Sequence, residues 1–186
     1  MRKRLITFVV LSVVLGLQLA LVQAHPISGM AADQKGLIKE IRHELVTLPY
    51  YGLFDWLEGE MRADGTLVLR GKVVRPSTKS EAESRVKGIE GVEKVVNEIE
   101  VLPLSPNDDR IRAAVYRAIF SSNSPLFRYA VRAVPPIHII VKNGRVTLKG
   151  VVATQQESQI ANVKTRSVSG VFEVRNELQV ESEGSH

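Results

Sequence analysis

The chain carries one pattern of residues twice, and this internal repeat limits the possible folds more than any other feature. Residues 64–71, Asp-Gly-Thr-Leu-Val-Leu-Arg-Gly, align with residues 143–150, Asn-Gly-Arg-Val-Thr-Leu-Lys-Gly, at an offset of 79. Further matches follow without a gap: Ala82 with Ala161, Gly91 with Gly170, Val95 with Val174, and Asn97 with Asn176. A register held over about forty residues indicates two copies of one small domain.

The apolar residues upstream of each pattern align at another offset, 74, so the second copy has five more residues between its first helix and first strand. Apolar residues recur every four positions there, which predicts an amphipathic helix over 33–46 and another over 108–120. Asn107 or Asp108 is the expected cap of the second helix. The later elements of each copy are two strands joined by a tight turn, a helix over about 77–88 or 155–167, and a strand over 92–102 or 171–180.

The order helix, strand, strand, helix, strand predicts an α+β fold. We expect two tandem αββαβ domains, each a three-stranded mixed sheet covered by two helices. The predicted domains span 33–102 and 107–181, with 103–106 as the linker. This linker, Pro-Leu-Ser-Pro, is short and stiffened by its prolines, so the domains should be close neighbours.

Glycines at matching positions are interpreted as structural. Asp64-Gly65 and Asn143-Gly144 each predict a two-residue hairpin turn, because such a turn needs positive φ at both positions. Gly71 and Gly150 fall in the inward phase of the strand after the turn. We expect a helix or a bulge to approach the sheet closely at these two glycines.

The third strand of each copy is also marked by matching residues. Gly91 and Gly170 end the connection that leads into it. Asn97 and Asn176 lie in phase with its inward residues, where an amide without a hydrogen bond would cost about 1–3 kcal/mol. We interpret both asparagines as ties between the strand and a neighbouring loop rather than as ligand-binding residues.

The second helix of each copy has its own start signal. Thr78 with Glu81, and Thr154 with Glu157, both fit a capping box, in which the two side chains bond backbone N–H groups of the first turn. The pairs do not occupy aligned positions. We therefore expect this helix to begin three residues earlier in the second copy.

Residues 1–24 have the layout of a secretory signal peptide. Met1–Arg4 is basic, an apolar run follows, and Val22-Gln23-Ala24 supplies small or branched residues before a cut after Ala24. The alternative is an uncleaved membrane anchor, but the apolar run is barely long enough to span a bilayer. The prediction is an exported protein whose signal peptide is cleaved after Ala24.

The mature chain is nearly neutral and contains no cysteine. The net charge of the whole chain is +5, and it falls to +2 because Arg2, Lys3 and Arg4 leave with the signal. This balance is weak support for a nucleic-acid partner, and we expect none. Without cysteine, the domains are held by their cores alone and form no thiolate metal site.

No motif in the sequence indicates catalysis. The four histidines, His25, His43, His138 and His186, are scattered, whereas a zinc site needs three or four converging ligands. No serine stands in a nucleophile-elbow pattern, and no glycine-rich loop fits a phosphate. We therefore expect no catalytic residue, no metal and no cofactor, and a hydrolase is the weakest of the functions considered.

The repeated pattern resembles the BON domain, which is found in osmotically inducible and envelope proteins of bacteria. The resemblance rests on Asn/Asp-Gly, on Val/Leu-x-Leu-x-Gly-x-Val, and on Gly-Val-x-x-Val-x-Asn-x-Leu/Ile-x-Val, and it covers essentially all of 33–181. It implies the αββαβ fold, a periplasmic location, no catalytic centre, binding of anionic phospholipid, and a role in envelope integrity or osmotic-stress protection. The first copy departs from the pattern at residues 48–56, Leu-Pro-Tyr-Tyr-Gly-Leu-Phe-Asp-Trp.

The two copies differ in charge. Residues 33–102 hold 11 basic and 13 acidic side chains, a net charge of −2, whereas 107–180 hold 11 and 5, a net charge of +6. The arginines of the second copy gather around its first helix and the loop after it. They form either an ordinary solvated helix face or a surface for anionic head groups. The predicted lipid-binding residues are Arg110, Arg112, Arg117, Phe127, Arg128, Tyr129 and Arg132.

Seven of the nine aromatic residues of the mature chain lie between a first helix and the strand after it. For Phe54 and Trp56, a position between the two domains is favoured over contact with a membrane. For residues 127–129, exposure is favoured, because prolines at 125, 135 and 136 indicate an irregular surface loop.

The sequence therefore predicts a non-enzymatic envelope protein that binds anionic phospholipid peripherally through its second domain. The alternative is a protein-interaction or scaffold module in a periplasmic complex, with envelope proteins as partners and exposed sheet edges as docking surfaces. Neither alternative fixes an oligomeric state.

Overall fold

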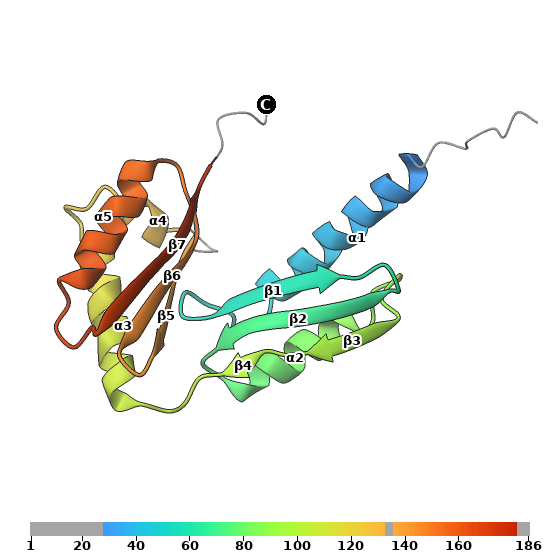
Figure 1. The fold of residues 1–186 in the computed structure, drawn as a ribbon, viewed down its shortest axis with the longest axis horizontal. Coiled ribbons are helices and arrows are strands. Elements are labelled where there is room, and N and C mark those ends of the chain that lie inside the picture. Colours follow the sequence, from blue (N-terminus) through green and yellow to red (C-terminus); the bar gives the residue numbers. More distant parts are fainter. Residues whose placement is uncertain (1–27, 133–135, 182–186) are drawn as a thin grey trace, which may run out of the picture.

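The protein consists of two domains of the same design, coloured blue to green and yellow to red in Figure 1. The computed structural model describes residues 28–132 and 136–181. The first domain contains α1 (Ser28–Val46), β1 (Trp56–Met61), β2 (Thr66–Val73), α2 (Pro76–Val86), β3 (Lys94–Asn97) and β4 (Glu100–Val101). The second contains α3 (Pro106–Ile119), α4 (Phe127–Ala130), β5 (Ile137–Lys142), β6 (Arg145–Val152), α5 (Gln155–Arg166) and β7 (Glu173–Val180).

The predicted αββαβ order is confirmed in both domains. α4 is a single extra turn within the longer connection of the second domain, and β3 and β4 form one interrupted third strand. The central strand, β2 or β6, pairs antiparallel with the first strand of its domain and parallel with the third. The parallel pair arises because a crossover helix returns the chain to the same end of the sheet.

One face of each sheet is apolar and packs against two helices. The side chains of Leu67, Leu69 and Val73 alternate along β2 and are all buried. Their counterparts on β6 are Val146, Leu148 and Val152. The helices contribute Ile41, Leu45, Ala82 and Val86 to the first core, and Ile111, Val115, Ile119 and Ala161 to the second. Each domain therefore has its own core.

The two hairpin turns differ in length. In the second domain, Asn143 and Gly144 both have positive φ, 52° and 73°, so the predicted two-residue turn is confirmed. In the first domain only Gly65 does, with a φ of 76°. The N–H of Gly65 donates to the carbonyl oxygen of Arg62, which places three residues, 63–65, in the loop. The prediction of a two-residue turn is wrong there.

The helix starts also differ from the predictions. Ser105, rather than Asn107 or Asp108, caps α3, and its hydroxyl oxygen accepts from the N–H of Asp108 at 3.2 Å. Thr154 caps α5 as predicted, by accepting from the N–H of Glu157. α2 has no side-chain cap, because it begins at Pro76 and Thr78 is buried inside it. α2 and α5 begin at aligned positions, so the predicted three-residue difference is wrong.

The glycines of the central strands make the predicted close approach. Gly71 and Gly150 have φ of 133° and 119°, and a Cβ on either would overlap a carbonyl oxygen of the neighbouring strand segment. The approaching group is therefore the backbone next in the sheet. Gly91 and Gly170, which precede the third strands, also have positive φ, 91° and 89°.

Asn97 and Asn176 tie the third strand to the second helix of their own domain. The Nδ2 of Asn97 donates to the carbonyl oxygen of Lys79 at 3.0 Å, and that of Asn176 to the carbonyl oxygen of Ser158 at 3.2 Å. The Oδ1 of each accepts from the N–H two residues further on. The structural interpretation is confirmed, with a helix in place of the expected loop.

Candidate functional site

Residues 48–56, which are most of the loop after α1 together with the first residue of β1, lie against the second domain, and we call them the seam segment. The carbonyl oxygen of Leu53 accepts from the N–H of Ile139, in β5, at 2.8 Å. Leu53 and Phe54 also pack against the core of the second domain. The residues that depart from the repeat thus join the two domains.

Aromatic and cationic side chains extend this contact. The ring of Trp56 meets that of His138 edge-on, with centroids 5.0 Å apart and planes at 72°. Tyr51 lies on another side of His138, with ring centroids 5.5 Å apart. The Nζ of Lys149 lies 5.5 Å from the centre of a Trp56 ring. The expectation that Phe54 and Trp56 lie between the domains is confirmed.

Ion pairs flank the aromatic contact. The Nζ of Lys149 lies 2.8 Å from an oxygen of Glu58 in the first domain and 3.1 Å from one of Glu177 in its own. Lys142 and Glu100 form a second pair across the seam. The hydrogen bond from Lys149 lowers the pKa of the Glu58 carboxyl below its usual value.

Asp55 fixes the shape of the seam segment. Its buried carboxylate accepts from the N–H of Gly52 at 3.0 Å and from that of Val74, at the end of β2, at 2.7 Å. Burial raises the pKa of Asp55, and the two backbone hydrogen bonds and the positive charges of Arg112 and Arg75 oppose this rise. The carboxylate therefore holds the loop to the sheet beside α3 of the next domain.

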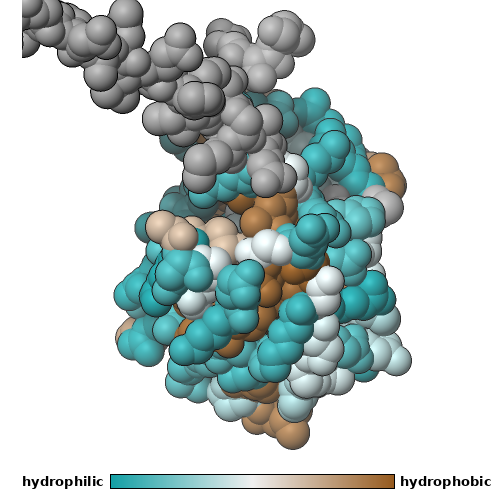
Figure 2. Space-filling model, turned by 90° about the vertical axis from the view of Figure 1, so that its right-hand side faces the viewer, coloured by the Kyte–Doolittle hydropathy of each residue, from teal (hydrophilic) through white to brown (hydrophobic). Residues whose placement is uncertain are grey.

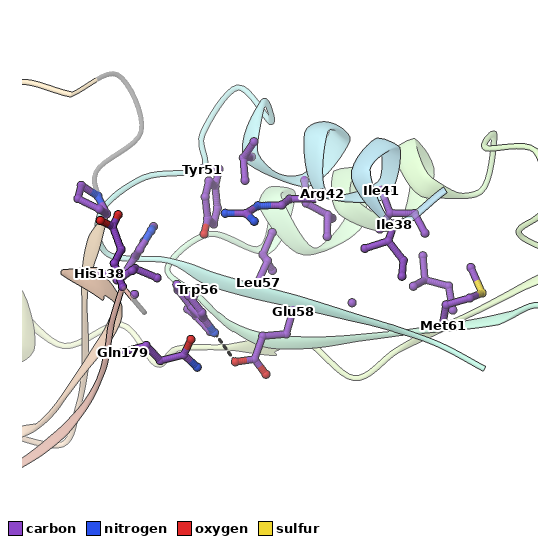
Figure 3. Close-up of a pocket in the computed structure, with 18 residues that line it drawn as sticks. Ile38, Ile41, Arg42, Tyr51, Trp56, Leu57, Glu58, Met61, His138 and Gln179 are labelled. Carbon is purple, nitrogen blue, oxygen red and sulfur yellow. Dashed lines mark hydrogen bonds between the residues drawn. The ribbon is translucent and has the colours of Figure 1, made fainter. Parts of the chain in front are cut away.

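An open groove of about 720 Å³ runs between α1 and β1 and reaches the second domain (Figure 3). One end is apolar and lined by Ile38, Ile41 and Met61. The other end is mixed and lined by Arg42, Tyr51, His138 and Gln179. Figure 2, which looks onto the end of the molecule where α1 begins, shows hydrophobic side chains in a hollow bordered by hydrophilic ones.

Two of the predicted lipid-binding residues are buried. Arg112 is 4% exposed, and its guanidinium donates to the carbonyl oxygen of Val141 at 2.8 Å and pairs with Asp109. Tyr129 is 3% exposed, and its hydroxyl donates to a carboxylate oxygen of Glu157 at 2.8 Å. The expected exposure of Tyr129 is wrong, because its ring joins the core and its hydroxyl has a buried acceptor. Neither side chain reaches a head group.

Arg128 has a structural partner. Its guanidinium pairs with Glu157 at 2.5 Å and lies 5.0 Å from the centre of the Tyr129 ring. Glu157 also accepts from the N–H of Ala153 at 3.0 Å. Arg128 is exposed at the surface, but its charge neutralises a nearly buried carboxylate.

The other predicted residues, Arg110, Arg117, Phe127 and Arg132, are exposed. The last turn of α3, the loop after it and α4 join the same core cluster through Ile119, Phe120, Leu126 and Tyr129, and we call this stretch, with Val131 and Arg132, the α3–α4 end. Its exposed side chains are Tyr116, Arg117, Phe127, Val131 and Arg132. The sequence prediction missed Tyr116 and Val131. Val131 directly follows α4, four residues after Phe127.

Other kinds of site were sought in the part of the chain that the structure describes. No group of three or more His, Cys, Asp or Glu residues is placed there to hold a metal ion. No helix of residues 28–132 and 136–181 is both long and apolar enough to cross a membrane. The predicted signal peptide, 1–24, lies outside the described residues.

Two segments of the chain, residues 62–103 and 107–182, match the family model described as the BON domain. The chain belongs to the BON family. The predicted tandem BON domains are thereby confirmed, and membership indicates an envelope-associated protein. The match to the first BON domain begins after β1, so α1, the seam segment and β1 lie outside it, whereas the match to the second BON domain includes α3 and β5.

Solved structures similar to this BON protein include two of CdsD. One is the C-terminal domain of CdsD, the structural protein of the type III secretion system of Chlamydia trachomatis, with 14% identity, a TM-score of 0.30, and coverage of 77% of this chain and 96% of that one. Another CdsD structure has 15% identity, a TM-score of 0.31, and coverage of 80% and 95%. No curated protein matches the chain.

Proposed function

We propose that this BON protein is a non-enzymatic periplasmic protein, exported with cleavage after Ala24, whose second domain binds anionic phospholipid at a membrane surface. Its role would be envelope integrity or protection against osmotic stress. The observation that carries the proposal is the α3–α4 end. Phe127 is 44% exposed and Val131 73% exposed, and the same stretch of chain carries the exposed Arg117 and Arg132.

The combination of side chains at this end favours a membrane surface over bulk water. Apolar side chains insert at the boundary between head groups and acyl chains, and arginines contact the anionic head groups. Among the described residues, Arg117 and Arg132 have no acidic partner within ion-pair distance, unlike Arg128. Their charges are therefore available to lipid. Each such charge contributes about 1 kcal/mol near an anionic membrane.

Sedimentation of the mature chain with vesicles tests the proposal. We expect binding to vesicles that contain phosphatidylglycerol, weaker binding at high salt, and little binding to vesicles of phosphatidylcholine alone. Replacing both Arg117 and Arg132 by Glu removes about 2 kcal/mol or more of attraction, so the partition coefficient should fall roughly thirty-fold.

The matched control reverses two exposed charges in the first domain, Arg62→Glu together with Lys94→Glu. This pair changes the net charge by the same amount, so it separates local contact from overall charge. Equal loss in both double variants, or equal binding to neutral vesicles, would contradict the proposal.

A scaffold role is the second candidate function. The observation that favours it is the open groove between α1 and β1, which is lined mainly by the first domain and includes no residue of the α3–α4 end.

A further inference from the structure

The cleft between the first helix and first strand is closed in the second domain. Arg112 on α3 donates to the carbonyl oxygen of Val141 on β5, so one side chain bridges helix and strand. The side chain of Ile139 fills the space below and is fully buried. The seam segment completes the closure, because Leu53 bonds the outer edge of β5 and packs on the core together with Phe54.

The same cleft is open in the first domain because each of these three groups is missing. Ile38 stands where the repeat has Arg112, and it is 52% exposed. Gly59 stands where the second domain has Ile139, since the two residues face the equivalent Leu69 and Leu148 of the central strands. Within the described part of the chain, no strand or backbone segment pairs with the outer edge of β1. These three differences produce the groove between α1 and β1.

The outer edge of β1 corresponds to the edge of β5 that the seam segment covers. Within the described residues, β1 pairs only with β2. By the register of the two sheets, the N–H of Gly59 takes the place of the Ile139 N–H that donates to Leu53. An edge strand of this kind accepts an added extended segment, which gains backbone hydrogen bonds and places alternate side chains in pockets.

We propose that the groove binds an extended segment of a partner polypeptide. The segment pairs with β1 at Gly59 and inserts an apolar side chain between Ile38, Ile41 and Met61. The groove continues into the interface of the two domains, where the seam segment, although it forms turns, already supplies a backbone acceptor and apolar side chains at the equivalent edge of β5. An acyl chain would fill the apolar end but would offer no acceptor to the Gly59 N–H. The chain's own C-terminal residues, Ser-Glu-Gly-Ser-His, carry no apolar side chain for it.

The probe is the peptide Leu-Pro-Tyr-Tyr-Gly-Leu-Phe-Asp-Trp, the sequence of the seam segment, with fluorescein at its N-terminus. Fluorescence anisotropy is measured with the full mature chain. We expect saturable binding that is at least tenfold weaker in Gly59→Ile and in Ile38→Arg, each of which installs the residue type that closes the other cleft. A Cβ on Gly59 already meets Ile41 and Leu67 at 3.4 Å, so the longer isoleucine fills this space, and Ile38→Arg tests the groove without changing the sheet.

Val163→Arg is the matched control, because Val163 is an exposed apolar residue on α5, away from the groove. It should bind the peptide like the unaltered chain, and thermal unfolding of all variants verifies the fold. No saturable binding by the unaltered chain would overturn the proposal. If both groove variants bind the peptide as tightly as the unaltered chain does, the peptide binds at β5 instead, and this result would also overturn the proposal. The proposal would also be overturned if the groove binds oleate, if Gly59→Ile abolishes that binding, and if the peptide does not bind.

The outcome of the peptide-binding experiment is independent of the outcome of the vesicle experiment. Arg117→Glu with Arg132→Glu should leave peptide binding unchanged, and Gly59→Ile should leave vesicle binding unchanged. Failure of one proposal can thus be told from failure of the other.

Discussion

At the scale of single residues, the two domains depend on glycines that admit a neighbouring backbone. Gly71 and Gly150 combine positive φ with a carbonyl oxygen in the place a Cβ would take. Any other residue type must strain its own backbone and displace the adjacent strand. Their inward phase in the sequence indicates a special position, and only the structure identifies the approaching carbonyl group.

Replacing Gly150 by Ala should lower the free energy of unfolding by about 3 kcal/mol or more, from the overlap and the positive φ together. Gly36→Ala is the control, because Gly36 is an exposed helical residue with nothing within 4 Å of its added Cβ. That change should instead raise stability by up to about 1 kcal/mol. Urea unfolding measures both, and a loss below about 1 kcal/mol at Gly150 would contradict the account.

The burial of side chains whose hydrogen-bond partners lie far along the chain could not be predicted from the sequence. Arg112 looks like any surface arginine of an amphipathic helix, yet it is buried because Val141, far along the chain, accepts its hydrogen bond. Tyr129 is buried for a similar reason, since Glu157 accepts from its hydroxyl. Composition and spacing do not reveal such partners. Asn97 and Asn176 could be interpreted because each lies among inward residues of a strand.

At the scale of elements, one carboxylate joins the first helix of the second domain to its hairpin. Asp108 is buried in the first turn of α3 and accepts from the N–H of Asn143 at 2.8 Å and that of Gly144 at 2.9 Å. The aligned residue of the first domain is Gln34. There the longer hairpin loop carries its own carboxylate, because Asp64 accepts from the N–H of Thr66 at 3.0 Å.

Asp108→Ala should therefore destabilise the protein by about 3 kcal/mol, because two N–H groups, one of them on the buried Gly144, lose a buried charged acceptor. Asp64→Ala should cost clearly less, because it removes a single backbone hydrogen bond made by an exposed side chain. Denaturant unfolding of the two variants gives the comparison. Equal losses would show that Asp108 does not hold the hairpin.

The order of elements and their register were predictable because apolar periodicity and repeated glycines are local signals. The caps and one turn were not. Thr78 and Glu81 fit a capping box, but Pro76 starts the helix earlier and leaves Thr78 inside it. Asp64-Gly65 fits a two-residue turn, but the pairing of Met61 with Leu67 leaves more residues in the loop. Packing of whole elements decided both cases.

At the scale of the whole molecule, the seam segment turns two similar domains into one body with two different surfaces. The short linker predicted neighbouring domains, and the odd stretch 48–56 was correctly expected to place rings between them. The groove could not be predicted. It results from Ile38 and Gly59 together, and it is evident only by comparison with the closed cleft of the second domain.

Lowering the pH should weaken the contact between the two domains, because Glu58 loses its negative charge. Lys149 lowers the pKa of Glu58 in the folded protein, so this pair stabilises the fold above the ordinary glutamate pKa of 4.5 and loses its effect as the pH falls through the lowered value. Glu58→Gln should lower stability at neutral pH by up to about 1 kcal/mol, because the pair is half exposed. The difference from the unaltered chain should vanish in acid. A difference that persists at all pH values would assign the effect to packing.

The central claim is that one architecture, used twice, presents its second domain to the membrane and its first domain away from it. The chain has no cysteine, so a fluorophore can be attached at Val131→Cys in the α3–α4 end or at Glu90→Cys on the surface of the first domain. Quenching by nitroxide lipids in phosphatidylglycerol vesicles then reports which domain meets the bilayer. The account predicts strong quenching at position 131 and little at position 90. Equal quenching at both positions, or quenching at position 90 alone, would contradict it.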